Sequence, residues 1–198
     1  AKQVPMRFGV KDLLRYLSYK SILARVVHDR SVVPLLGRLT GKVLELGAGN
    51  HDYSIYACNA SQYVRSDYNP PVKDARIKID ATNINFPDSS FNAVVCMSAL
   101  EHIENFGAVL DEVHRILKPG GRFLLCVPWV FPFHGAPDDY YRFSASSLRR
   151  NLSRYEIEEF EAVGNYWLTQ AVFLQRPRWS RRKDATGAKF YDPILRLL

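Results

Sequence analysis

The sequence predicts an α/β fold built on a mainly parallel sheet. Five short apolar runs follow residue 41, and the connections between them are long enough to hold helices. The runs around Val94 and Phe123 are apolar at consecutive positions, as expected of strands covered on both faces. A Gly-Ala-Gly turn directly follows the first run and should open a helix. Together these features favour a Rossmann-like, doubly wound sheet. The expected strands are residues 42–46, 62–66, 76–79, 93–97 and 122–127.

A helix is expected between the last two strands, and the chain after it is harder to interpret. Val109, Leu110, Val113 and Ile116 mark one helical face, and the Pro-Gly-Gly of residues 119–121 should stop that helix. Residues 155–163 and 166–174 are interpreted as strands that close the sheet, although the second segment also fits a helix.

The residues before the first strand predict an N-terminal helical cap. Leucine, isoleucine and valine recur there at helical spacing among Lys and Arg, and the helices should end before Pro34 and Gly37. A cap on the domain is favoured over a membrane-surface helix, although a basic amphipathic face suits both. We therefore expect an N-terminal helical cap (1–41), a central α/β domain (42–175) and a basic C-terminal tail (176–198).

Charge is unevenly distributed along the chain. The formal net charge is +7, but residues 1–42 and 176–198 are strongly basic, whereas residues 43–175 are acidic overall. The basic ends could bind an anionic partner such as RNA or a membrane surface, or could simply be a solvated periphery. The 47% of hydrophobic residues suffices for a core, which excludes a wholly disordered chain.

Cysteine usage and hydropathy favour a cytoplasmic protein. Cys58, Cys96 and Cys126 have neither CxxC nor Cys/His ligand spacing, so neither a disulfide framework nor a zinc site is expected. The apolar runs are shorter than a membrane span needs, and the first residues lack a signal-peptide core.

Acidic residues end the second and third expected strands, in a pattern typical of nucleotide binding. Asp67 ends the second expected strand, twenty positions after Gly47, where its carboxylate could accept bonds from ribose hydroxyls. Asp80 ends the third. The structural alternatives are a turn cap for Asp67 and an Asx turn or N-cap for Asp80.

From residue 42 to about residue 143 the chain resembles the class I S-adenosylmethionine methyltransferases, in their small type-11-like group. The similar stretches are residues 43–49, 86–95, 98–103 and 117–121, with Asp67 and Asp80 between them. The resemblance implies S-adenosylmethionine as cofactor. It implies cofactor contacts by Glu45, Gly47, Ala48, Gly49, Asp67, Tyr68, Asp80, Ala81 and Ser98. The chain departs from the family at His51, where a third glycine is common, and at Asn92, where Asp is usual.

Two histidines are candidate catalytic bases. Methyl transfer from a sulfonium requires no metal, but an oxygen or nitrogen acceptor needs a base to take its proton. His102 follows the fourth strand, and His134 lies in a polar and aromatic stretch after the fifth, residues 129–143, here called the lid. His134 is the preferred base, because imidazole titrates near neutral pH, although it could instead bond a loop carbonyl. For Asp138, Asp139 and Arg142 a salt-bridged turn is favoured over catalysis.

We therefore expect an S-adenosylmethionine-dependent methyltransferase that acts on oxygen or nitrogen of a small-molecule, glycan or lipid-precursor acceptor. Two alternatives are a catalytically silent binding module of the same fold and an RNA methyltransferase that uses the basic termini, where Trp179 lies among arginines. An NAD-dependent oxidoreductase is disfavoured, because Asp52 stands where the last glycine of GxGxxG would be.

Overall fold

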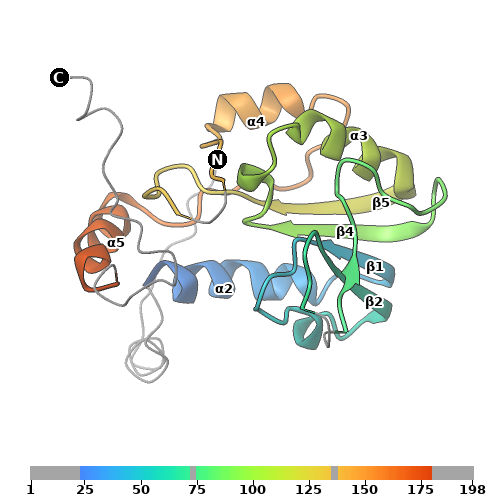
Figure 1. Ribbon diagram of the computed structural model, residues 1–198, viewed down its shortest axis with the longest axis horizontal. Helices are drawn as coiled ribbons and strands as arrows, with labels where there is room; N and C mark the ends of the chain where they lie inside the picture. The colour runs from blue at the N-terminus through green and yellow to red at the C-terminus, as the bar shows by residue number, and fades with distance from the viewer. Residues whose placement is uncertain (1–22, 72–74, 135–137, 180–198) are drawn as a thin grey trace.

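One parallel sheet organises the protein, as the sequence predicts. The computed structural model describes residues 23–71, 75–134 and 138–179. Its five strands pair in the order β3-β2-β1-β4-β5, and every pair is parallel (Figure 1). The chain order therefore reverses between β1 and β4, which is the switch point of a Rossmann-like fold. The strands are β1 (Gly41–Leu46), β2 (Ala60–Asp67), β3 (Ile77–Lys78), β4 (Phe91–Met97) and β5 (Leu117–Cys126).

Helices cover both faces of the sheet. Figure 1 shows α2 (Leu23–Leu36) on one side and α3 (Phe106–Ile116) with α4 (Ala145–Asn151) on the other. Alternate residues of β1 and β4 supply the two cores, because successive side chains of a strand point to opposite faces. Leu44 and Val94 pack with the apolar stripe of α3, whereas Val43 and Val95 pack with α2. The doubly wound arrangement is thus confirmed.

The helix α3 follows from its sequence pattern. Its buried residues are Val109, Leu110, Val113 and Ile116, which lie on one helical face. The Asn105 side chain accepts a hydrogen bond from the Ala108 N–H and caps the first turn. The loop between β4 and α3 is therefore held at a defined place at the carboxyl edge of the sheet.

The glycine turn after β1 does not open a helix, contrary to the expectation. Residues 47–59 are all described and contain only a short 3₁₀ turn, η1 (Ser54–Tyr56). The Asp52 carboxylate accepts hydrogen bonds from the N–H and hydroxyl of Ser54, and such local bonds compete with helix formation. Buried Tyr53 also fastens this segment to α2, since its hydroxyl lies 3.3 Å from His28 Nδ1.

The N-terminal helix continues further than expected. The helix α2 includes Pro34 and ends at Leu36, although its end was expected before Pro34. Pro34 lacks a backbone N–H, so the helix loses one hydrogen bond there. Because Pro34 is exposed, the buried face formed by Val32 and Leu36 is not disturbed. The first part of the expected cap, residues 1–22, lies outside the described residues.

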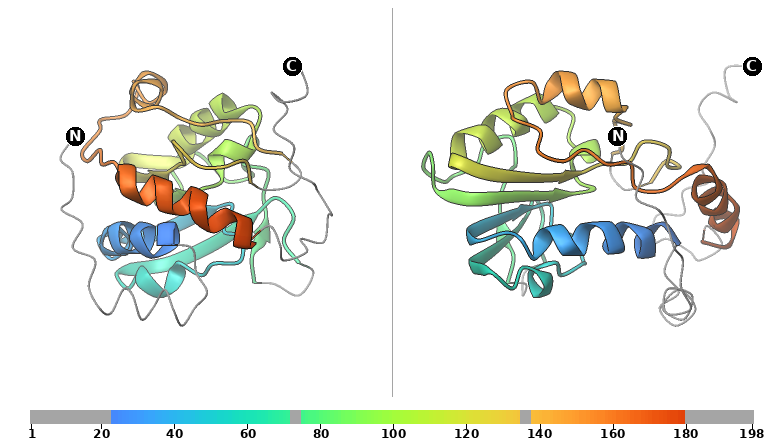
Figure 2. Two further views of the ribbon diagram at one scale, coloured as in Figure 1. Left: turned by 90° about the vertical axis from the view of Figure 1, so that its left-hand side faces the viewer. Right: turned by 180° about the vertical axis from the view of Figure 1, so that it is seen from behind.

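The end of the sheet also differs from the expectation. β5 begins at Leu117, five residues earlier than expected, and residues 118–121 form an irregularity within it opposite β4. Residues 155–163 do not pair with β5, so the prediction of closing strands there is wrong. The second segment is helix α5 (Tyr166–Trp179), which lies next to α2 (Figure 2).

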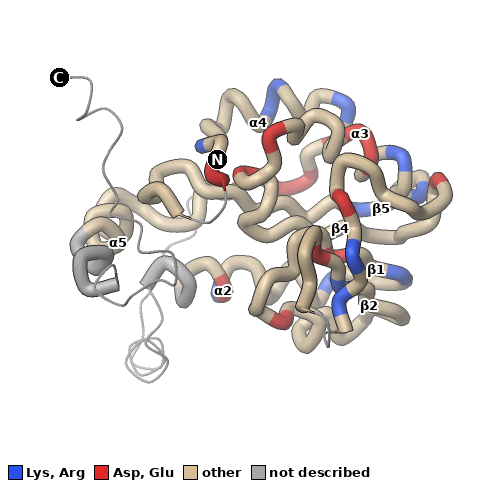
Figure 3. Tube along the Cα trace, in the orientation of Figure 1, with Lys and Arg blue, Asp and Glu red and all other residues tan. Residues whose placement is uncertain are grey.

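The charged residues of the described part carry both signs, as Figure 3 shows. Most of the basic termini, and so most of the expected anionic-partner site, lies outside the described residues. Within the described residues, no helix combines the length and apolarity needed to cross a bilayer.

Candidate active site

The Gly-Ala-Gly turn lies at the carboxyl end of β1 and depends on its glycines. Gly47 and Gly49 have φ angles of +65° and +52°, in the left-handed region that favours glycine. A Cβ on Gly47 would lie 2.4 Å from the Cβ of Ala99, which belongs to the loop after β4. The Ala48 N–H donates to the Ser66 carbonyl of β2 at 2.8 Å. The turn is therefore fixed between the ends of β2 and β4.

Asp67 lies beside this turn, and its carboxylate is already engaged. One oxygen accepts a hydrogen bond from the Gly49 N–H at 3.0 Å and lies 3.6 Å from Nη1 of Arg76. The other accepts from the Asn69 N–H at 3.2 Å, which is the turn bond of the structural alternative. The nearly buried Arg76 guanidinium also donates to the Gly49 carbonyl. A ribose hydroxyl would share or replace the Arg76 contact.

Asp80 lies at the same sheet edge as Asp67, two residues beyond β3, and is exposed. One of its oxygens accepts hydrogen bonds from the N–H and hydroxyl of Thr82, at 2.9 and 2.7 Å, which forms an Asx turn. The neighbouring Ala81 packs against the core, and Tyr68 beyond β2 is exposed. The two aspartates that were expected to face one nucleotide therefore emerge on one side of the protein.

Glu45, the remaining cofactor candidate of β1, is buried rather than open to a ligand. Burial raises the pKa of its carboxyl group to about 7, and the Arg65 guanidinium, 3.8 Å away, opposes part of that rise. Arg65 also lies 3.4 Å from Asp52 and donates to the His51 carbonyl. This region therefore contains a network of two carboxylates around one guanidinium.

The two departures from the family pattern have local explanations. The His51 ring packs on Tyr53 with ring centroids 4.3 Å apart, so the turn accommodates a large side chain in place of a third glycine. The Asn92 side-chain oxygen accepts from the Lys42 N–H and from Lys118 Nζ. Asn92 thus joins the beginnings of β1 and β5, which is a structural role.

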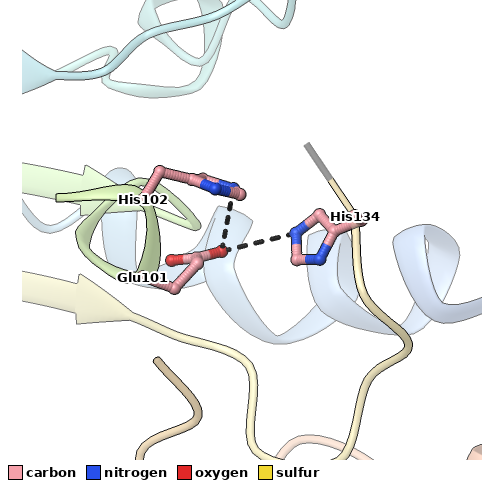
Figure 4. Close-up of side chains that lie close together, drawn as sticks. All are labelled: Glu101, His102 and His134. Carbon is pink, nitrogen blue, oxygen red and sulfur yellow. Dashed lines mark ion pairs between the residues drawn. The ribbon is translucent and has the colours of Figure 1, made fainter. Parts of the chain in front are cut away.

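The two candidate bases, His102 and His134, lie together although 32 positions apart in the chain. Their ring centroids are 4.9 Å apart in an edge-to-face arrangement. Figure 4 shows both rings around the carboxylate of Glu101, which lies in η2 (Leu100–His102) just after β4. The Nε2 atoms of His102 and His134 lie 3.7 and 3.6 Å from the same oxygen, Oε1. Glu101 is completely buried.

Sequence reasoning missed Glu101 and Arg76 as site residues. Glu101 lies in residues 98–103, one of the stretches that resemble the family. Its position directly before His102 is the sequence signal that could have identified it. Its importance depends on burial, which a sequence does not show. Arg76 was taken only as the first residue of a strand. The cluster of Glu101, His102 and His134 could hold a metal ion, because the three ligand atoms lie within 4.8 Å of one another.

The lid is held by Arg142 and Asp139. The Arg142 guanidinium donates to both carboxylate oxygens of Asp139, at 2.5 and 2.6 Å, and also to the carbonyls of Phe131 and Pro132. This pairing lowers the pKa of Asp139 against the opposing effect of its burial. The favoured salt-bridged turn is therefore present. The lid is joined to η2, because Tyr140 and Tyr141 donate backbone hydrogen bonds to the Glu101 carbonyl.

A large open cavity extends along β5, from residues 117–121 at its amino end to the lid and α5 at its carboxyl end. Its volume is about 1640 Å³, and Ser98, Glu101 and His134 are part of its lining. Ser98 directly follows β4 and has a φ of +51°, a strained conformation for a residue with a side chain. Trp129 and Phe133 of the lid are more than half exposed. Asp67 and Asp80 do not line this cavity.

Comparisons with known proteins agree with this fold. The profile of a family described as a methyltransferase domain matches residues 36–125. A demethylmenaquinone methyltransferase of Clavibacter sepedonicus is 32% identical over 154 aligned residues, which cover 68% of this chain and 62% of that protein. The chain therefore spans less than two thirds of that relative's length.

Solved structures show the same architecture at low sequence identity. The YcgJ protein of Bacillus subtilis has a TM-score of 0.56 at 18% identity, covering 81% of this chain and 87% of its own. The [4+2]-cyclase SpnF has a TM-score of 0.55 at 21% identity, covering 73% of this chain and 63% of its own. These likenesses establish the fold but not the chemistry.

Proposed function

Residues 36–125 of this chain belong to a class I S-adenosylmethionine-dependent methyltransferase domain, and from that premise we propose that the protein methylates oxygen or nitrogen of a small-molecule acceptor. One observation carries the proposal: the Gly47–Gly49 turn is hydrogen-bonded to Asp67 at the switch point of the sheet. Ligands of open α/β sheets bind at this point.

The cofactor would be held by the cofactor half of the edge, formed by β1, β2 and β3. Gly47, Ala48 and Gly49 let the backbone approach the adenosyl group, and Asp67 would accept bonds from its ribose hydroxyls. The second oxygen of Asp80, left free by the bonds to Thr82, suits the adenine amino group. Glu45, Tyr68, Ala81 and Ser98 complete the proposed set of cofactor contacts.

The acceptor would bind in the cavity between the lid and α5. Its position beside Ser98 and Glu101 is next to the end of β4, on the far side of the switch point from Asp67. The rings of Trp129 and Phe131, which line this cavity, favour an aromatic or apolar acceptor. The name of the Clavibacter relative, a demethylmenaquinone methyltransferase, is consistent with an acceptor of that class.

In the proposed reaction the acceptor heteroatom attacks the methyl carbon in line with the carbon–sulfur bond. That bond breaks, its electron pair returns to sulfur, and S-adenosylhomocysteine leaves as a neutral thioether. The acceptor loses a proton, for which His134 and His102 are the candidate bases. The protein's contribution is alignment of the two reactants and exclusion of water.

Asp67→Asn tests the cofactor half. We expect its dissociation constant for S-adenosylhomocysteine to rise about 10- to 100-fold, because a hydrogen bond to a charged acceptor contributes about 1.5–3 kcal/mol. Titration calorimetry measures this value. Asp88→Asn, at a surface carboxylate paired with Arg115, is the matched control and should bind like the wild type. Absence of binding by the wild type at millimolar ligand would exclude the proposal.

The silent binding module is the second candidate, and the contact of Arg76 with Asp67 favours it. An arginine paired with the proposed ribose-binding residue Asp67 would weaken cofactor binding and slow turnover. Release of S-adenosylhomocysteine across a panel of hydroxylated and amino aromatic acceptors distinguishes the two candidates. Cofactor binding without release for any acceptor would support the silent module.

A further inference from the structure

The Glu101 carboxylate lacks the hydrogen bonds that a buried anion needs. Its side chain is fully buried, and among the described residues neither of its oxygens has a hydrogen-bond partner. Burial of an unpaired carboxylate is strongly unfavourable, so such groups are paired with a cation or coordinate a metal. Within the described residues, the ion-pair contacts of this carboxylate are with His102 and His134, at 3.7 and 3.6 Å. These separations exceed the range of a hydrogen bond.

Both imidazoles present a lone pair to Glu101 when neutral. His102 Nδ1 lies 2.7 Å from the carbonyl oxygen of Asp138, which can only accept, so Nδ1 carries the hydrogen and Nε2 is free to coordinate. His134 Nδ1 faces two acceptors, the Pro132 carbonyl at 3.2 Å and the Asp139 carboxylate at 3.5 Å. Arg142 Nη2 also lies 3.3 Å from it, but that guanidinium is already bonded to Asp139. Metal-bound histidines commonly have such carbonyl or carboxylate partners on the second nitrogen.

The spacing of the three ligand atoms is close to that of a metal site. Bonds of about 2.1 Å place neighbouring ligand atoms about 3–3.4 Å apart. The Glu101–His102 and Glu101–His134 separations are within about half an ångström of that range, and the three atoms lie within 4.8 Å of one another. Small side-chain rotations would complete the site. Glu101 and His102 are neighbours in η2, and the lid that carries His134 is bonded to η2 through Tyr140.

We propose that Glu101, His102 and His134 form a two-histidine, one-carboxylate site for a divalent first-row transition ion. This donor set suits Zn²⁺, Fe²⁺, Mn²⁺, Co²⁺ or Ni²⁺, whereas Mg²⁺ prefers an all-oxygen shell. Three protein ligands leave coordination positions open toward the cavity that Glu101 and His134 line. An oxygen of the acceptor can bind there, and the ion lowers the pKa of that hydroxyl group.

The catalytic role of the ion rests on the proposed function. That role restricts the acceptor to a molecule with a hydroxyl group. With both imidazoles coordinated, that hydroxyl would lose its proton to solvent rather than to His134 or His102, and its oxygen would then take the methyl group as the carbon–sulfur bond breaks. The binding of the ion does not rest on the proposed function. Metal binding and S-adenosylhomocysteine binding are therefore measured in separate titrations, so that failure of one is distinguishable from failure of the other.

The experiment is titration of the tag-free, chelator-treated full chain with Zn²⁺ by calorimetry and with Co²⁺ by visible absorption. A Cys58→Ser background removes the exposed thiol, which could bind these ions by itself. We expect one ion per chain with a dissociation constant of about 10 μM or lower. Glu101→Gln, His102→Gln and His134→Gln should each weaken binding at least 30-fold. His114→Gln, at an exposed histidine of α3 outside the cluster, is the matched control and should bind like its background.

The metal-free variants supply a second readout. Glu101→Gln should unfold at the same or a higher temperature than the wild type without metal, because it removes an unpaired buried charge. Zn²⁺ should raise the unfolding temperature of the wild type but not that of Glu101→Gln. If Glu101→Gln does not fold, the two histidine variants decide the result. No stoichiometric binding by the wild type, or undiminished binding by both histidine variants, would overturn the proposal.

Discussion

The acidic residues in the two halves of the carboxyl sheet edge have different partners. In the cofactor half, Asp67 lies 3.6 Å from Arg76, and Glu45 lies 3.8 Å from Arg65. The acceptor half is formed by η2 and the lid. There the guanidinium of Arg142 is bonded to Asp139 and not to Glu101. Glu101 is left with two imidazoles beyond hydrogen-bond distance.

This difference separates a site that is stable without a ligand from one that needs a cation. A carboxylate with an arginine partner has its charge compensated, so a polar ligand must compete with that arginine. A buried carboxylate that faces imidazoles instead of an arginine lacks a permanent cationic partner and gains from any cation that enters. We therefore expect the proposed cofactor half to resist its ligand and the proposed acceptor half to favour a cation.

The largest expected effect concerns the contact where the two halves meet. Gly47→Ala should lower the free energy of unfolding by about 2–5 kcal/mol, since it combines a left-handed backbone with overpacking against Ala99. Chemical denaturation measures the change. Gly120→Ala is the matched control: its φ is +73°, but a Cβ there would meet nothing within 4 Å. That variant should lose only about 1–2 kcal/mol.

A double variant separates the two contributions to the Gly47→Ala effect. Ala99→Gly in the Gly47→Ala background should restore the part that comes from overpacking, as a favourable coupling energy in a double-mutant cycle. Coupling near zero would show that the two halves do not constrain one another at this point.

The next effect is a pH dependence in the cofactor half. The pKa of Glu45 is raised by burial to about 7 from its ordinary value of 4.5, so the folded protein binds a proton more tightly than the unfolded chain. The free energy of unfolding should therefore fall as the pH rises from about 4.5 to 7. Above pH 7 the cost is fully present, and there Glu45→Gln should be more stable than the wild type by about 1–3 kcal/mol.

Denaturation curves between pH 5 and 8 test this slope, with Glu158→Gln, at an exposed glutamate, as the control. A Glu45→Gln variant less stable than the wild type at pH 8 would mean that the pair with Arg65 outweighs the burial of Glu45. The difference in charge compensation between Glu45, paired with Arg65, and Glu101 would then be larger.

The smallest effect tests whether Arg76 competes with the cofactor. Arg76→Met retains an apolar stem and removes the positive charge beside Asp67, so S-adenosylhomocysteine should bind about three- to tenfold more tightly. Calorimetry gives the dissociation constant, and Arg149→Met, at an exposed arginine stacked on Phe160, is the control. Weaker binding would instead indicate that Arg76 holds the Gly49 turn in the form that the cofactor needs.

Local sequence patterns were enough to predict the sheet and the position of the Gly-Ala-Gly turn. The five strands, the α3 stripe and the glycine turn beside Asp67 were predictable, because strand and helix periodicity and glycine chemistry are local properties. Two expectations drawn from the same patterns failed. The segment after Gly49 has a turn instead of a helix because Tyr53 contacts α2, and residues 155–163 do not extend the sheet, although their pattern permits a strand.

Only the tertiary structure decided which charges are compensated. His102 and His134 were each identified as candidates, but nothing in the sequence indicated that both face the same oxygen of Glu101. Nor did it indicate that Arg76 lies on Asp67 while Arg142 is bonded to Asp139. Ion pairing and burial depend on distances between residues far apart in the chain. Those distances are fixed only when both core faces pack against the sheet.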